Sequence, residues 1–411
     1  MKWINFFHWY QPPGQQRSIV EKVARESYGP MVEFLLSRPE VRVTINISGA
    51  LTEQLAEYGL SSLLDGIRQL AERGQVELVG TAAYHVILPL VPDETPRQIK
   101  LHTDINSRAF GSTYKPSGFF PPEMCYSKAV EHMVHEAGFT WMILDEIAWD
   151  GHLGNVSFQH RYTSGIESMA IVFRDRVLSN FLAFTASLDV PEQFWQAVHN
   201  DGRSDAYLVT AMDGENLGHH RKGLDRFWQT LVTDHRVTTM TVSAYLQELE
   251  DEHPCTPLPS SWSTEERGMN DQVPFGLWDN PDNEIHALQW QLTRLVCEEV
   301  ARAKREHDQG YEKARNLLDR ALSSDQYWWA SAQPWWSVEI VTDGAKRLAE
   351  VVGQLQTMAP EQRQAVSGLF ASITERVRYW EDNGIVQKRQ EEFLQRCTTA
   401  PYMGGKKVAS R

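Results

Sequence analysis

The chain has 411 residues, of which 42% are hydrophobic and 23% are charged, proportions that are ordinary for a soluble globular protein. Its formal net charge of −14 makes nucleic acids and anionic membranes poor partners. No apolar run reaches the length of a membrane span, and the four cysteines form no CxxC pair, so we expect a cytoplasmic protein with reduced thiols.

The first part of the chain alternates short β-branched or aromatic runs with longer amphipathic runs. Strands are expected at six places: 3–8, 41–48, 76–81, 118–123, 139–146 and 206–214. Helices are expected over four ranges: 18–39, 60–74, 94–114 and 127–138. Strands alternating with helices of this length predict a parallel sheet with crossover helices. The pattern alone leaves open whether the sheet closes into a barrel.

After about residue 283 the strand pattern stops, and the chain becomes a series of amphipathic segments. Helices are expected over 283–307, 310–324 and 359–383, which together predict a helical bundle. We therefore predict an α/β domain over 1–282 and a helical domain over 283–400. The last residues, 401–411, are expected to form a flexible tail.

Chemically capable side chains follow the carboxyl ends of the predicted strands, which is where ligands bind in parallel α/β folds. One polar residue at one strand end carries little information, but such groups at six strand ends indicate a site assembled from many segments. In chain order these residues are His8, Tyr10, Gln11, Asn46, Ser48, Thr81, Tyr84, His85, Glu123, Asp145, Glu146 and Asp213.

Two of these carboxylates suggest the chemistry. Glu123 follows aromatic and proline residues that stiffen the backbone and limit water, and Asp213 follows an apolar strand. Paired carboxylates flanking a bond are what glycoside cleavage requires. Sugar rings also stack on aromatic faces while their hydroxyls bind polar groups. Suitable tryptophans in predicted loops or at segment ends are Trp9, Trp262, Trp278, Trp328, Trp329, Trp335 and Trp336.

The two carboxylates have competing interpretations. Glu123 is also placed to cap the following helix, although the rigid Pro-Pro approach favours a functional role. Glu215 competes with Asp213, because residues two apart share a face if the strand continues. Sequence alone does not separate these two acids. Glu215 alternatively binds a sugar hydroxyl or influences the pKa of Asp213.

Other candidates also have structural alternatives. His85 either reaches the substrate or is a hydrogen-bonded loop histidine. We expect Asp145 in the site and Glu146 on a solvated loop. Trp328 and Trp329 belong to the core of the helical domain or face the substrate, and adjacent helical residues cannot both face one way.

Four short segments carry a family resemblance: GQVELVG (74–80), GFFPPEM (118–124), AMDGENLG (211–218) and SSDQYWW (323–329). They resemble the second to fifth of the five short regions that define glycoside hydrolase family 57. Its members are retaining α-glucan-active amylases, branching enzymes and glucanotransferases. This chain departs from the family pattern in the first region, because it has Tyr10-Gln11-Pro12 where studied members carry His-Gln-Pro. The resemblance spans residue 1 to about 340.

The resemblance implies an α/β fold, an irregular (β/α)7-type barrel followed by a C-terminal helical bundle domain that completes the site. It implies that Glu123 is the nucleophile and Asp213 the general acid/base. It implies an α-linked oligo- or polysaccharide substrate, while the identity of the sugar and the choice between hydrolysis and transfer stay open. The substrate-binding candidates are His8, Tyr10, Gln11, His85, Asp145, Glu215, Trp262, Asp325 and Trp328.

Two other functions compete with this one. A metal-dependent polysaccharide deacetylase needs an Asp and two His around a metal, for which His8, His85 and Asp145 are available. A non-catalytic sugar-binding barrel is the third possibility. His102 and Asp104 have a zinc-like spacing but fall mid-helix, so a solvated face is expected. We expect no cofactor, no metal, no nucleic acid and no membrane partner, and the oligomeric state stays open.

Overall fold

The computed structural model describes residues 1–166, 169–203 and 206–399, without the side chains of 397–399. The predicted tail over 401–411 lies outside the described residues. The chain forms two compact units, the first over Met1–Trp262 and the second beginning at Ser263. We describe each unit by itself.

The first unit contains the strands. They are β1 (Lys2–Trp9), β2 (Val43–Ile47), β3 (Val76–Val79), β4 (Gly118–Phe119), β5 (Trp141–Asp145), β6 (Arg161–Ser164), β7 (Ala170–Arg174), β8 (Tyr207–Asp213), β9 (Thr238–Met240) and β10 (Glu252–Cys255). All six predicted strand positions are confirmed. The sequence analysis did not predict β6, β7, β9 or β10.

The helices of the first unit follow most of the strands. They are α1 (Arg17–Val23), α2 (Gly29–Ser37), α3 (Gly49–Glu57), α4 (Ser61–Glu72), α5 (Thr95–Phe110), α6 (Lys128–Glu136), α7 (Ile147–Asp150), α8 (Arg176–Asn180), α9 (Pro191–Asp201), α10 (Leu224–Val232) and α11 (Val242–Glu248). The helix predicted over 18–39 consists of α1, a π-helical segment η1 (Ala24–Tyr28) and α2. A second π-helical segment, η6 (Phe181–Thr185), follows α8.

Two sheets join into a ring. One sheet has the order β3-β2-β1-β8, with β9 also paired to β1, and the other has the order β10-β6-β7-β5-β4. Between β3 and β4, the Gly80 N–H donates to the Gly118 carbonyl and the Phe120 N–H donates to the Gly80 carbonyl, both at 2.9 Å. Between β7 and β8, the Asp175 N–H donates to the Val209 carbonyl at 2.8 Å. The strands β1, β2, β3, β4, β5, β7 and β8 therefore close a barrel, as the family resemblance implies.

The junction between β3 and β4 depends on glycine. A Cβ on Gly80 would lie 2.4 Å from the ring of Phe139, and one on Gly118 would lie 2.0 Å from the ring of Trp141. Both aromatic side chains are buried against the strands. Any larger residue at either glycine would therefore displace one of these buried rings, which pack next to the junction of β3 and β4.

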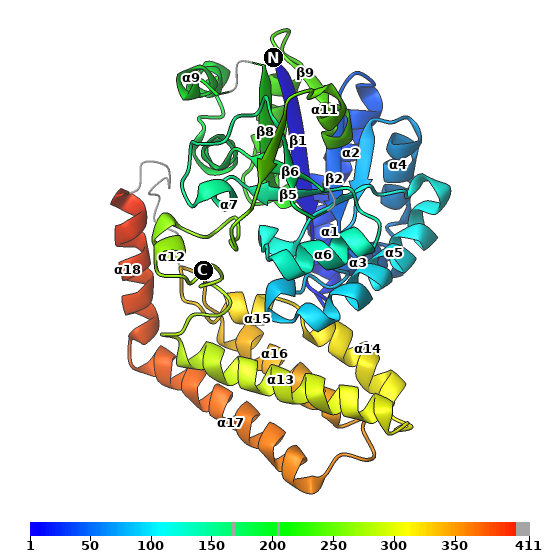
Figure 1. Ribbon diagram of the computed structural model, residues 1–411, viewed down its shortest axis with the longest axis vertical. Helices are drawn as coiled ribbons and strands as arrows, with labels where there is room; N and C mark the ends of the chain where they lie inside the picture. The colour runs from blue at the N-terminus through cyan, green and yellow to red at the C-terminus, as the bar shows by residue number, and fades with distance from the viewer. Residues whose placement is uncertain (167–168, 204–205, 400–411) are drawn as a thin grey trace. The chain divides into compact units, whose positions relative to one another are not determined.

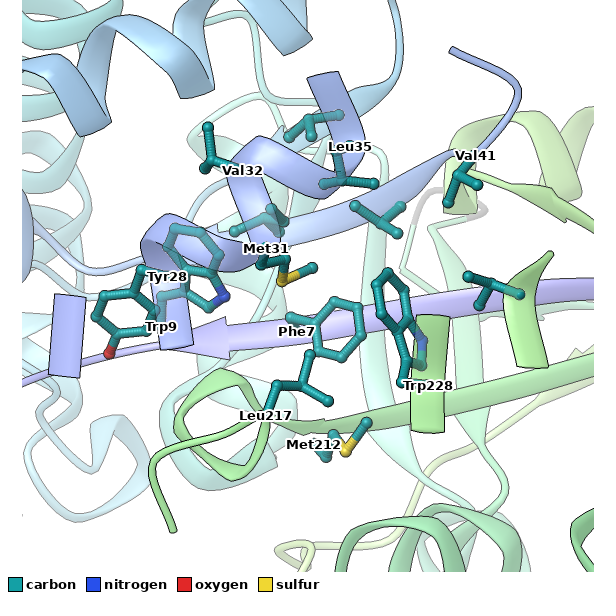
Figure 2. Packing of buried hydrophobic residues seen from close by; sticks show 14 of the residues in the cluster. Phe7, Trp9, Tyr28, Met31, Val32, Leu35, Val41, Met212, Leu217 and Trp228 are labelled. Atoms are coloured by element: carbon teal, nitrogen blue, oxygen red, sulfur yellow. The ribbon is translucent and has the colours of Figure 1, made fainter. Parts of the chain in front are cut away.

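Alternate residues of β1 divide between the helices and the barrel interior. On the helix side, Phe7 meets Trp228 of α10 edge-on at 5.3 Å, and Trp9 stacks on Tyr28 of η1 at 4.5 Å (Figure 2). On the other side, Phe6 stacks on Phe120 at 5.4 Å. β1, β2 and β8 run through this unit with α2 and α4 on its outside (Figure 1). The register of β1 therefore directs His8 into the barrel.

Two whole-chain expectations concern membranes and cysteines. No helix in the described ranges is long and apolar enough to cross a bilayer. Cys125, Cys255 and Cys297, whose side chains are described, form no disulfide. The cytoplasmic location stays a prediction.

The second unit is helical. Its helices are α12 (Glu266–Asn270), α13 (Glu284–Arg305), α14 (Tyr311–Ala321), α15 (Asp325–Trp328), α16 (Val338–Val352), α17 (Pro360–Asp382) and α18 (Ile385–Thr399). The long helix α13 packs against α14, α16 and α17 (Figure 1). The three helices named from the sequence correspond to α13, α14 and α17, so the predicted helical C-terminal region is confirmed.

A buried aspartate ties two loops of this bundle together. Asp308, between α13 and α14, accepts the N–H groups of Gly310, Gln356 and Thr357 at 2.6–2.7 Å and the Thr357 hydroxyl at 2.8 Å. Burial alone would raise the pKa of this carboxyl, but these donors outweigh it and lower the pKa to about 2. The ionised form is therefore the one that the fold stabilises.

We expect Asp308→Ala to lower the free energy of unfolding at neutral pH by about 2 kcal/mol, because several buried donors lose a charged acceptor. The folded pKa lies below the unfolded value of about 3.9, so the stabilisation is present above pH 4 and is lost as the pH falls toward 2. Urea unfolding at several pH values measures this. Asp343→Ala, at an exposed position of α16, is the control. Equal effects of the two substitutions would contradict the assignment.

Candidate active site

Glu123 lies directly after β4 in a strained stretch of backbone. Its φ is 59° and that of Met124 is 51°, both in the left-handed region that non-glycine residues rarely adopt. His85, which follows β3, has a φ of 57°. The turn at Glu123 is held by the Met124 N–H, which donates to the Pro121 carbonyl at 2.7 Å. Strained backbone of this kind collects at functional sites.

The carboxylate of Glu123 is held by Trp262, which lies far from it in the sequence, and is flanked by His85. The indole N–H of Trp262 donates to Glu123 Oε2 at 2.7 Å. The Trp262 backbone N–H donates to the Glu123 carbonyl at 3.0 Å. On the other side, His85 Nε2 lies 3.6 Å from Glu123 Oε1. The Glu123 side chain keeps 20% of its surface exposed, so it is oriented by Trp262 without being fully buried.

A chain of neutral imidazoles supports His85. Asn46 Oδ1 lies 2.6 Å from His8 Nδ1, and His8 Nε2 lies 3.0 Å from His85 Nε2. Burial lowers the pKa of His8 to about 4, and burial together with His8 lowers that of His85 well below its usual value. Both rings are therefore neutral at pH 7. With the amide oxygen of Asn46 facing His8, His8 carries its proton on Nδ1, and His85 donates to His8.

Aromatic rings line this part of the barrel. Tyr10 stacks on His85 at 4.1 Å, and His8 stacks on Phe120 at 4.7 Å. Trp262 meets Phe120 edge-on at 5.7 Å. Tyr10 and Trp262 are half-buried. The structure thus brings His8, Tyr10, His85 and Trp262 together around Glu123, and the sequence predicted all four as site residues.

Asp213 ends β8, next to the same region. It lies opposite His8 in the parallel register of β1 and β8. Burial raises the pKa of Asp213 to about 6, and the nearby positive charge of Arg174 partly offsets this effect. A carboxyl with this pKa exchanges its proton close to neutral pH, which suits a general acid that later acts as a base.

Glu215 is the second carboxyl of the turn after β8. Its Oε1 accepts the Gln11 amide at 3.1 Å, the Tyr10 backbone N–H at 3.3 Å and the hydroxyl of Tyr28. Burial, followed by the charge of Asp213, raises its pKa, and the Tyr28 and Gln11 donors oppose this rise. Asp213 and Glu215 therefore resist being ionised together. Glu215 is placed to influence Asp213, which is one of its two predicted roles.

Asp145 is engaged by two arginines. Its Oδ2 accepts Arg174 Nε at 2.7 Å, its Oδ1 accepts Arg176 Nη2 at 2.6 Å, and its side chain has no exposed surface. This environment does not support a sugar contact, and we do not carry that role forward. The prediction that Glu146 lies on a solvated loop is wrong. Glu146 is fully buried and pairs with Arg203 at 2.6 Å.

The expected solvated position of His102 is also wrong. His102 is fully buried in α5 and lies within hydrogen-bond distance of the Ile47 carbonyl, Asn106 and the Tyr114 hydroxyl. It therefore supports the packing of α5 on β2. In the part of the chain that the structure describes, no group of three or more His, Cys, Asp or Glu side chains is arranged to hold a metal.

The remaining two candidates belong to the second unit. Asp325 begins α15 and contacts the Ser323 hydroxyl. Trp328 ends α15, and its ring lies 5.8 Å from each of Trp329 and Trp335. Trp328 and Trp329 are both half-buried, so neither is simply part of the core. Their contribution to the site of the first unit stays a prediction.

The comparison with known families decides which family the chain belongs to. The sequence model of Glycosyl hydrolase family 57 matches residues 3–256, which covers β1 to β10 and both carboxylates. The chain belongs to this family. The resemblance drawn from the four short segments is thereby confirmed.

Two curated relatives each align with 60% of the chain. An α-amylase of Pyrococcus horikoshii is 28% identical over 261 residues, which is 60% of this chain and 40% of that protein. A 4-α-glucanotransferase of Thermococcus litoralis is 27% identical over 264 residues, 60% of this chain and 39% of that protein. This chain thus aligns with only about two fifths of the length of these relatives.

A solved structure extends the similarity of fold to both units. A family 57-type branching enzyme of Pyrococcus horikoshii superposes with a TM-score of 0.66 at 15% identity, covering 91% of this chain and 95% of that chain. At this identity the match shows the fold alone. The barrel and the helical region that follows it therefore form the architecture of family 57 in this chain.

Sequence reasoning missed two residues of this family 57 site. Arg174 ends β7, whose apolar run AIVFR is a strand signal followed directly by charges, so a search of strand ends could have found it. Tyr28 lies in the π-helical segment η1. Nothing in its local sequence indicates that its hydroxyl reaches Glu215.

Proposed function

We propose that this protein is a retaining α-glycoside hydrolase or transglycosylase that acts on α-glucans or related oligosaccharides. One observation carries the proposal: two unlike carboxyls face the same end of the barrel. Glu123 is fixed by Trp262, and Asp213 has a pKa raised to about 6. Family membership and the names of the relatives support the choice of substrate class.

In the first step, Glu123 attacks the anomeric carbon of the sugar. Asp213 protonates the glycosidic oxygen as its bond to that carbon breaks. The product is a glycosyl ester on Glu123 and a released sugar or alcohol. The indole of Trp262 orients the attacking carboxylate, so that less motion is needed to reach the carbon.

In the second step, ionised Asp213 takes a proton from water or from a sugar hydroxyl. The resulting nucleophile attacks the anomeric carbon, and the bond to Glu123 breaks. Two inversions leave the anomeric configuration unchanged. Water gives hydrolysis and a second sugar gives transfer, and the same two carboxyls serve both.

The neighbouring polar and aromatic groups fit the binding of a sugar. Tyr10 and Trp262 offer half-buried rings for the apolar faces of sugars, while His85 and Gln11 supply hydrogen-bonding groups and His8 orients His85. Tyr10 replaces the histidine of studied family members, so its hydroxyl changes which sugar hydroxyls are recognised. Asp325 and Trp328 of the second unit are further proposed sugar contacts.

We expect the purified protein to convert maltooligosaccharides, with products first released as the α-anomer. Proton NMR of the fresh reaction mixture measures this, and transfer appears as oligosaccharides longer than the substrate. Activity should persist after exhaustive treatment with a chelator, since no step uses a metal. Loss of activity on chelation, with recovery on adding zinc, would favour the deacetylase. Binding of glucan without any turnover would favour the non-catalytic barrel.

A further inference from the structure

Arg174 is a buried arginine whose contacts reach several parts of the barrel. From the end of β7, its Nε donates to Asp145 of β5 at 2.7 Å. Its Nη1 donates to the Ala211 carbonyl of β8 at 2.8 Å, and its Nη2 donates to the Trp262 carbonyl at 3.3 Å. One planar guanidinium thus joins β5, β7, β8 and the segment that carries Trp262.

The contact with Trp262 extends to Glu123. The guanidinium carbon of Arg174 lies 5.1 Å from the centre of the Trp262 ring, so the arginine holds this residue by its carbonyl and by its ring. The same indole donates to Glu123 Oε2 at 2.7 Å. The position of the Glu123 carboxylate therefore depends on a residue that does not touch it.

Through its contact with β8, Arg174 also influences Asp213. Ala211, whose carbonyl Arg174 binds, is two residues before Asp213, so it faces the same side of the strand. The charge of Arg174 also acts directly on Asp213. The other titratable groups that face Asp213 are His8 of β1, Tyr28 of η1 and Glu215 of the following turn.

We propose that Arg174 is a positioning residue that orients both Glu123, through Trp262, and the end of β8 that carries Asp213. The inference rests on the proposed function, because it concerns the two carboxyls that carry out that reaction. Asp145 fixes the guanidinium from behind and is itself held by Arg176, which explains why the carboxylate of Asp145 is fully buried. Asp145, which the sequence predicted as a site residue, thus acts through Arg174.

The experiment compares Arg174→Lys with Arg174→Met. Lysine keeps the charge but cannot reach three acceptors in one plane. We expect both variants to lower kcat by about 100-fold, because the carboxyls lose their alignment. Only Arg174→Met should move the basic limb of the pH–rate profile, by about one unit to higher pH, since a charge that lowered the pKa of Asp213 is gone.

A second measurement does not need turnover. The indole N–H resonance of Trp262, assigned by its loss in Trp262→Phe, should shift in both Arg174 variants. The control is Arg203→Met, which removes a buried arginine bound to Glu146, Asp175 and Asp201. It should lower stability and leave both the Trp262 resonance and the pH limb in place.

The outcomes separate this inference from the proposed function. An unchanged Trp262 resonance and an unchanged pH limb in Arg174→Met would overturn the positioning role. Equal changes in Arg203→Met would also overturn it, because the effects would then be general damage. If the native protein cleaves no α-glycoside while the resonance still shifts, the proposed reaction fails and the role in catalysis fails with it.

Discussion

Replacing Glu123 with Gln should lower kcat on an α-glucan by at least about 10⁴-fold, the scale seen when a catalytic nucleophile is removed. The amide is nearly the same size, so the strained turn at φ 59° is expected to persist. The loss should appear in kcat, because the covalent intermediate no longer forms. Initial rates of product release, measured by chromatography, give the size of the effect.

Glu136→Gln is the matched control, since this glutamate is exposed at the end of α6. It should keep full activity. A sharper test uses Glu123→Gly with azide and an aryl α-glycoside that has a good leaving group. Azide fits the vacated space and should restore turnover with inversion, giving a β-glycosyl azide. If the product were an α-glycosyl azide, or if Glu123→Gln were fully active, Glu123 would not be the nucleophile.

The sequence predicts much of this site because of one geometric rule. The carboxyl ends of parallel strands meet at one end of a barrel, so side chains after separate strands come together. His8 after β1, His85 after β3, Glu123 after β4 and Asp213 after β8 all follow this rule. Each strand was recognised from its local pattern, and no long-range information was needed.

The supporting contacts escape such reasoning because they join residues that are distant in sequence. Trp262 reaches Glu123 across 139 positions. Glu146 was expected to be solvated because its local sequence is polar, but Arg203, 57 positions away, neutralises it in the interior. A buried charge needs a partner, and a single sequence does not reveal which partner the fold supplies.

The antiparallel pairing of β6 with β7 was missed for a related reason. The strand β6 is four residues long and alternates half-buried with buried positions, so it gives a weak signal. Its partner β7 is buried throughout, as expected for a strand in the barrel wall. Recognising β7 as a strand would have placed Arg174 among the strand-end residues.

Asp213→Asn should abolish the basic limb of the pH–rate profile on an unactivated α-glucan and lower kcat by about 10²–10⁴-fold. In the native protein the rate should fall as the pH rises through about 6, because Asp213 then loses the proton that it donates. Asparagine has no such proton to lose. The first step should be spared for aryl α-glycosides whose leaving groups need no protonation, so their hydrolysis should become limited by the second step.

The variant Glu215→Gln tests which of the two neighbouring carboxyls, Asp213 or Glu215, is the general acid/base. Burial and the charge of Asp213 raise the pKa of Glu215 to about 8, so Glu215 is already neutral at the pH where Asp213, with a pKa of about 6, loses its proton. The basic limb should therefore stay in place in Glu215→Gln, unlike the shift to higher pH expected for Arg174→Met. If Asp213→Asn instead left the profile unchanged and Glu215→Gln removed the limb, Glu215 would be the acid/base, with Tyr28 and Gln11 setting its proton affinity.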